Sequence, residues 1–185
     1  GAFSGFAAQL GLLINQIYGP SSTFAENHDV ASLPTGAAYA YLGPLIGAGV
    51  RALWGPLCDK FGGAIWTFIS GIGMAASLGW AALYLNPKDP SEFTWFLTAM
   101  LVFFFFTGLG NAGTFKQMPM ILPKRQAGGV IGWTGAVGAF GPFIVGIMLS
   151  MMAAPTFFWG CVIFFVITTA LVWVYYARPN APYPG

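Results

Sequence analysis

The chain has 185 residues, of which 57% are hydrophobic and only 6% are charged, and its formal net charge is +2. Soluble domains carry about 25% charged residues, so this composition excludes a soluble globular domain and a disordered segment. Seven basic side chains without a basic stripe cannot neutralise a run of phosphates, which excludes a nucleic-acid partner. The composition therefore predicts a polytopic membrane protein in a lipid bilayer.

Charged and turn-forming residues divide the sequence into six long apolar stretches. A transmembrane helix needs about 20 apolar residues, and these stretches lack the alternation of a membrane β-barrel. We therefore expect an all-α polytopic membrane protein, with residues 1–185 forming a single six-transmembrane-helix bundle. The expected spans cover residues 1–18, 36–57, 64–85, 92–122, 128–151 and 156–177.

An even number of spans places both ends of the chain on one side of the membrane. The loops on that side carry the basic residues Lys60, Lys124, Arg125 and Arg178. The opposite loops carry one lysine, Lys88, among four acidic residues. The positive-inside rule therefore predicts that both termini are cytoplasmic. His28, the only histidine, falls in the first opposite loop, and we expect it to be solvated.

Glycine is abundant, with 26 residues, and recurs regularly in two expected spans. The fifth span has one at every third position: Gly129, Gly132, Gly135, Gly138 and Gly141. Each step of three turns the helix face by about −60°, so the small surface winds around the helix and lets several neighbours approach. The second span has the same packing signal at Gly43 and Gly47. The alternative interpretation is a sliding surface for a moving helix.

Arg51 lies well inside the second expected span. A charge at that depth costs at least about 2.5 kcal/mol. No expected span has an acid in its interior, and Asp59 lies roughly 12 Å further along the axis at 1.5 Å per residue. Arg51 either snorkels to the cytoplasmic face, pairs with an acid on another segment, or binds an anion in an aqueous cavity. The parallel donors of a guanidinium suit a small planar oxyanion, which favours anion binding.

A polar stripe in the fourth expected span is the second candidate for the site. Thr107, Asn111 and Thr114 share one helical face by their i, i+4, i+7 spacing. Polar groups facing lipid are costly, so this face contacts protein or water. Asn111 either forms hydrogen bonds between helices or donates to the same anion as Arg51. The candidate substrate-binding residues are thus Arg51, Thr107, Gly110, Asn111 and Thr114.

Two charged positions lie nearer the cytoplasmic face. Lys116, five residues beyond Asn111, either snorkels or serves as an anion relay. Gly55, Asp59 and Lys60 form a compact motif with an acid and a base between consecutive spans. A salt bridge that forms in one state only would bias a conformational equilibrium, so we take these three as candidate gating residues. The alternative is an ordinary solvated turn.

The expected spans contain no catalytic machinery. They hold no nucleophile–base pair, no metal-ligand cluster and no cofactor motif. The sequence therefore predicts neither an enzyme nor a bound cofactor or metal.

These motifs carry a family resemblance that extends over essentially the whole chain. Residues 55–63 resemble the second-half cytoplasmic loop motif of the major facilitator superfamily. Residues 41–51 are similar to the eighth helix of NarK-type nitrate/nitrite porters, which carries a substrate-binding arginine. Residues 108–121 resemble the second nitrate signature on the tenth helix, and residues 126–134 resemble the start of the eleventh.

The resemblance implies the C-terminal half, helices seven to twelve, of a nitrate/nitrite transporter in a bacterial inner membrane. Arg51 would bind nitrate or nitrite, with Asn111 near it. Such transporters bind substrate between two halves near mid-membrane, so an N-terminal six-helix half, on the same or a separate chain, is the implied partner. Transport would proceed by alternating access, which one half alone does not support.

Two further expectations concern mechanism and class. Because no carboxylate lies inside a span, anion exchange is favoured over proton symport. The alternative function is a half-transporter-like structural or assembly subunit of a larger membrane complex. An unpaired buried arginine argues against that alternative, since a scaffold has no need of one.

Overall fold

The structure is a computed structural model that describes residues 1–27, 29 and 32–183. His28 lies outside the described residues, so its expected place in a solvated loop stays a prediction. The regular elements of the described residues are all helical, which confirms the all-α expectation. They are α1 (Ala2–Ile17), η1 (Thr23–Asn27), α2 (Gly36–Tyr39), α3 (Leu42–Phe61), α4 (Gly63–Ala82), α5 (Glu92–Ile121), α6 (Lys124–Ala139), α7 (Gly141–Met151), α8 (Ala154–Val172) and η3 (Trp173–Ala177).

Four helical stretches of the described residues are long and apolar enough to cross a membrane: Gly63–Ala82, Glu92–Ile121, Lys124–Met151 and Ala154–Ala177. The helix α1 is apolar but has only 16 residues. The helix α3 has 20 residues but carries Arg51, Asp59 and Lys60. The fold is therefore a membrane helix bundle with four candidate spans, and the count of six spans stays a prediction.

Prolines break two of the expected spans. The second span divides into α2 and α3, because the ring of Pro44 conflicts with the carbonyl of residue 40, four positions earlier. The fifth span divides at Phe140, just before Pro142 at the start of α7. Pro142 has no N–H for the carbonyl of Gly138, and the Ser4 hydroxyl is shared between that carbonyl, at 3.3 Å, and the Gly1 carbonyl, at 3.1 Å. The break thereby fixes the first turn of α1 against α6.

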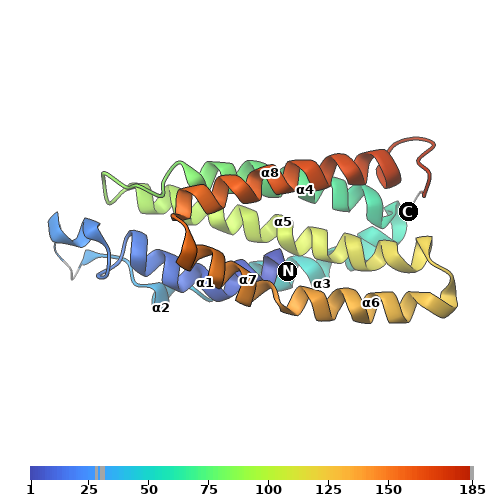
Figure 1. The fold of residues 1–185 in the computed structure, drawn as a ribbon, viewed down its shortest axis with the longest axis horizontal. Coiled ribbons are helices and arrows are strands. Elements are labelled where there is room, and N and C mark those ends of the chain that lie inside the picture. Colours follow the sequence, from blue (N-terminus) through green and yellow to red (C-terminus); the bar gives the residue numbers. More distant parts are fainter. Residues whose placement is uncertain (28, 30–31, 184–185) are drawn as a thin grey trace.

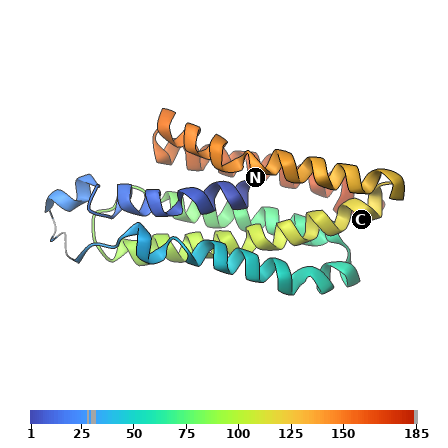
Figure 2. The same ribbon diagram turned by 90° about the horizontal axis from the view of Figure 1, so that it is seen from below.

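Figure 1 shows an elongated bundle in which α5 runs through the middle. The helix α5 packs against α3 and α4, α4 packs against α8, and α1 packs against α7. The α3–α4 turn, the α5–α6 turn and the C-terminal segment lie at one end of the bundle (Figure 1). Seen from below, α6 and α7 run together along one flank (Figure 2).

An aromatic core joins α1, α5 and α8. Its fully buried rings include Phe6, Phe96, Phe103, Phe104 and Phe158. Phe6 meets Phe103 edge-on with ring centroids 4.8 Å apart, and it meets Phe158 in the same manner at 5.6 Å. These edge-to-face contacts fill the end of the bundle where the loops after α1 and α4 lie.

Glycines bring α3 and α5 into backbone contact. A Cβ on Gly43 would collide with the Phe104 ring, and a Cβ on Gly47 would lie 3.2 Å from the Phe104 carbonyl oxygen. A Cβ on Gly108 would lie 2.9 Å from the Cα of Gly47. The packing role predicted for Gly43 and Gly47 is therefore confirmed, and Gly108 supplies the facing surface.

The glycines of α6 differ from expectation. A Cβ on Gly129, Gly132 or Gly135 would meet no atom within 4 Å, whereas Gly138 and Gly141 approach the first residue of the chain. The expected close packing on several sides is therefore wrong for the first three positions within this chain. The physical reason is that α6 packs little against the other described helices: Ala127 is its only buried residue, so its glycine face has no described helix against it.

Replacing Gly108 with alanine tests the α3–α5 contact. The new methyl group would meet backbone, which cannot move aside by a rotamer change, so we expect destabilisation of about 1–3 kcal/mol and a lower melting temperature in detergent. Gly79→Ala is the matched control, because its Cβ would lie 3.8 Å from the Trp159 and Val162 side chains. Equal melting temperatures for the two variants would contradict the proposed backbone contact.

Candidate functional site

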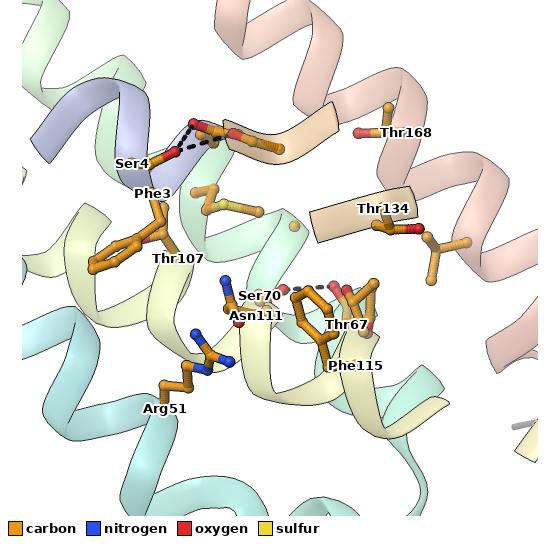
Figure 3. Close-up of a pocket in the computed structure, with 18 of the residues that line it drawn as sticks. Phe3, Ser4, Arg51, Thr67, Ser70, Thr107, Asn111, Phe115, Thr134 and Thr168 are labelled. Carbon is orange, nitrogen blue, oxygen red and sulfur yellow. Dashed lines mark hydrogen bonds between the residues drawn. The ribbon is translucent and has the colours of Figure 1, made fainter. Parts of the chain in front are cut away.

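A cavity of about 610 Å³ lies between α1, α3, α4, α5, α6 and α8 (Figure 3). All five residues predicted to bind substrate line it: Arg51, Thr107, Gly110, Asn111 and Thr114. The α3–α5 glycine contact positions them, because it places the Arg51 side of α3 against the polar face of α5. Residues from two separate predicted spans thus meet in one cavity.

Arg51 reaches into the cavity from α3 without an acidic partner. It makes no ion pair and no hydrogen bond with any other described residue. Its nearest acid along the helix, Asp59, pairs with Lys116 instead. The Arg51 Cζ atom lies 5.5 Å from the ring centroid of Phe115. The guanidinium therefore keeps its full charge and all its donors.

Asn111 supplies an unsatisfied amide next to this charge. Its Oδ1 atom is buried and has no hydrogen-bond partner among the described residues. A buried polar atom left in that condition costs about 1–3 kcal/mol, so a donor such as water or the guanidinium is required there. Figure 3 shows the Arg51 side chain pointing from α3 toward Asn111, whose amide nitrogen faces the open part of the cavity.

The hydroxyl groups near Asn111 are already engaged within the protein. Thr107, only 4% exposed, donates to the Phe104 carbonyl at 2.9 Å. Thr67 donates to the Gly63 carbonyl at 2.9 Å, and its oxygen lies 3.5 Å from the Thr114 hydroxyl. These two threonines thus link α4 to α5. Of Thr107, Asn111 and Thr114, only Asn111 has a buried side-chain oxygen without a hydrogen-bond partner among the described residues.

Gly110 contributes by its missing side chain. A Cβ there would press on the Ser70 hydroxyl of α4, so glycine lets α4 approach α5 behind the cavity. Ser70 itself donates to the Thr67 carbonyl at 2.7 Å. Gly110 therefore lines the cavity and sets the α4–α5 distance.

Several cavity residues were missed by the sequence reasoning. They are Phe3, Ser4, Thr67, Ser70, Phe115, Thr134, Thr168 and Thr169. Phe115 follows Asn111 by four positions, so the helical spacing that united the polar stripe could have included it. The others come from helices without a charged residue in the cavity, and isolated threonines and serines gave no signal of their own.

The candidate gating residues lie outside the cavity lining. The Lys116 Nζ atom is 2.8 Å from the Asp59 Oδ2 atom, and the two side chains are 43% and 54% exposed. The structure extends α3 to Phe61, so Asp59 and Lys60 lie in the last turn of that helix and not in a turn between spans as expected. The Lys60 ammonium lies 5.4 Å from the Phe61 ring centroid, and Asp59 pairs across helices with Lys116. A Cβ on Gly55 would meet open space. The ion pair joins the cytoplasmic ends predicted for α3 and α5.

No family model matches the chain. It is 45% identical to the probable nitrate/nitrite antiporter NarK2 of Thermus thermophilus, over 100% of this chain and 41% of that protein. It is 29% identical to the nitrate/nitrite transporter NarU of Escherichia coli strain K12, over 75% of this chain and 36% of NarU. The nitrate/nitrite transporter NrtP of Nostoc punctiforme is 31% identical over 74% of this chain and 26% of NrtP.

The chain thus spans about two fifths of the length of the first of these curated relatives, and less of the others. The similarity to NarK2 nevertheless runs along all of this chain, which includes both segments that carried the resemblance, residues 41–51 and 108–121. The chain is therefore similar over its whole length to part of the NarK2 relative, and over about three quarters of its length to parts of the nitrate/nitrite transporters NarU and NrtP.

Proposed function

We propose that this chain is the C-terminal six-helix half of a NarK-type nitrate/nitrite transporter of the major facilitator superfamily. In this proposal Arg51 and Asn111 bind the transported oxyanion. The observation that carries the proposal is an unneutralised guanidinium in a cavity beside an unpartnered buried amide. The names of the relatives supply the class of anion, nitrate or nitrite.

The chemistry of the two side chains fits a small planar anion. A guanidinium offers two parallel N–H groups to two oxygens of one ligand, and its charge compensates the ligand's single negative charge. The Asn111 amide nitrogen adds a donor from α5, while Oδ1 accepts from the guanidinium or from water. A hydrogen bond to a charged group is worth about 1.5–3 kcal/mol, so a few such bonds suffice for affinity in the range of cellular substrates. Thr107, Gly110 and Thr114 would line the cavity around the bound anion.

A second half would complete the site. Two observations support this part of the proposal: the chain matches only 41% of the NarK2 relative, and α6 presents uncovered apolar residues beside its glycine face. Trp133 is 73% exposed, and Phe140 is 61% exposed. The anion would sit between Arg51 and an arginine of the N-terminal half. The two arginines repel until the anion lies between them, so binding would favour closure during alternating access.

The same proposal places the protein in a bacterial inner membrane with both ends of this segment cytoplasmic. The turns that carry Lys60, Lys124 and Arg125 lie at one end of the bundle, together with the C-terminal segment (Figure 1). That asymmetry supports the orientation through the positive-inside rule. The described residues that line the cavity include no acid, which supports anion exchange over proton symport for this half.

The substitution Arg51→Lys tests the anion site. It keeps the charge but removes the two-pronged donor, so we expect nitrate affinity to fall at least about tenfold, or roughly 1.4 kcal/mol. The measurement is nitrate and nitrite binding by calorimetry on the full polypeptide that carries this chain. Arg125→Lys is the matched control, because Arg125 is exposed and lies outside the cavity. Unchanged affinity in Arg51→Lys would remove Arg51 from the site.

The Asp59–Lys116 pair supports the second part of the proposal, a gate at the cytoplasmic ends of α3 and α5. An exposed pair of this kind contributes about 0–1 kcal/mol to stability, so its value would lie in biasing one transport state over another. Gly55 and Lys60 would let the adjoining turn move as the pair opens and closes.

We expect Asp59→Asn to change the nitrate exchange rate in proteoliposomes about two- to fivefold, which corresponds to about 1 kcal/mol or less. The melting temperature should stay nearly constant. The exchanged double variant, Asp59→Lys with Lys116→Asp, should restore the rate by remaking the pair. A relay role for Lys116 predicts the opposite, since an aspartate at that position repels the anion. Wild-type rates in Asp59→Asn would refute the gate.

A further inference from the structure

Phe115 is the residue that contacts the Arg51 guanidinium in this structure. It lies on α5, one helical turn beyond Asn111, and lines the same cavity. Its ring centroid is 5.5 Å from the Arg51 Cζ atom, within the range of about 6 Å in which a ring attracts a cation. Figure 3 shows Phe115 and Asn111 on one side of the cavity, with Arg51 reaching toward them from α3.

An aromatic partner suits an arginine that must bind an anion. A carboxylate would neutralise the guanidinium and occupy its donors. A phenyl ring attracts the cation through its quadrupole but carries no net charge and accepts no conventional hydrogen bond. Contact with Phe115 therefore holds the Arg51 side chain while its charge and donors stay available to a ligand.

Holding the side chain matters because arginine is long and flexible. A free guanidinium must give up rotamer freedom when it binds, and that loss weakens affinity. Arg51 has no other described side-chain partner, so the ring is what restricts it. A side chain already aimed at the cavity has less freedom to lose.

Two contacts, one between backbones and one between side chains, join the helices that carry this pair. The Gly47–Gly108 contact joins α3 to α5 on one side of Arg51 along α3. The Asp59–Lys116 ion pair, at 2.8 Å, joins the same helices on the other side, and Lys116 is next to Phe115 in the sequence. In this structure the ring and the guanidinium therefore meet between two contacts of α3 with α5.

We propose that Phe115 is a positioning residue that aims the Arg51 guanidinium into the cavity beside Asn111 by a cation–π contact. The inference rests on the proposed function, because it assigns a role within the same anion site. Phe115 itself does not touch the anion in this proposal. It raises affinity by ordering the residue that does.

Fluorinated phenylalanines at position 115 provide the test. Each added ring fluorine weakens the quadrupole and leaves the size of the ring nearly unchanged, so a residue that only packs would be insensitive to the series. We expect nitrate affinity to fall stepwise, with the trifluorinated ring losing roughly three- to tenfold. The exchange rate at saturating nitrate should change little, since the loss lies in binding. Phe115→Leu should resemble the trifluorinated protein, and Phe115→Trp should retain wild-type affinity or exceed it.

Phe105 is the matched control position. It also lies on α5 and meets an aromatic ring, that of Trp54 at 5.4 Å, but it does not line the cavity. Trifluorination there should leave nitrate affinity unchanged. Equal affinity across the series at position 115 would overturn the positioning role and leave the proposed function intact. Failure of the unsubstituted polypeptide to bind nitrate or nitrite would overturn both.

Discussion

The structure depends on one positive charge, the Arg51 guanidinium, that faces a cavity without an acid partner among the described residues. The nearest acid along α3, Asp59, lies about two helical turns away and pairs with Lys116 on α5. If α3 crosses the membrane as proposed, such a charge is costly unless a cavity with water or a ligand surrounds it. Three features surround this charge: the cavity, the Phe115 ring, and the Asn111 amide, whose buried Oδ1 atom has no partner among the described residues.

Small residues make that arrangement possible. Only glycine at positions 47 and 108 lets the α3 and α5 backbones touch, and only this contact brings the guanidinium within reach of the polar face of α5. Gly110 does the same for α4 on the opposite side of α5, where Ser70 approaches it. The site thus depends as much on absent side chains as on charged ones, and adding a single methyl group should disturb it.

Local patterns in the sequence predicted local parts of this site well. Helical spacing predicted that Thr107 and Asn111 share one face, and the charge of Arg51 in an apolar stretch predicted a cavity beside it. Each of these arguments needs the sequence of one helix only. The partner of Asp59 was not predictable, since Lys116 is 57 residues away and only the α3–α5 packing brings them together. Phe115 shares the helical face of Asn111, but among 18 phenylalanines that spacing does not single out one ring until a cation is found beside it.

The donor inventory of the cavity restricts what the proposed transporter selects. The hydroxyl protons of Thr107 and Thr67 are donated to backbone carbonyls, so these side chains present oxygen lone pairs to a ligand. Donors therefore remain at Arg51, at Asn111 and at the buried Thr169 hydroxyl, which has no partner among the described residues, and Arg51 is the one charged side chain of the described cavity lining. That set matches a monovalent oxyanion with few acceptor oxygens. In the proposed site a dianion would retain an uncompensated charge at this half, so the single guanidinium would favour a monovalent anion.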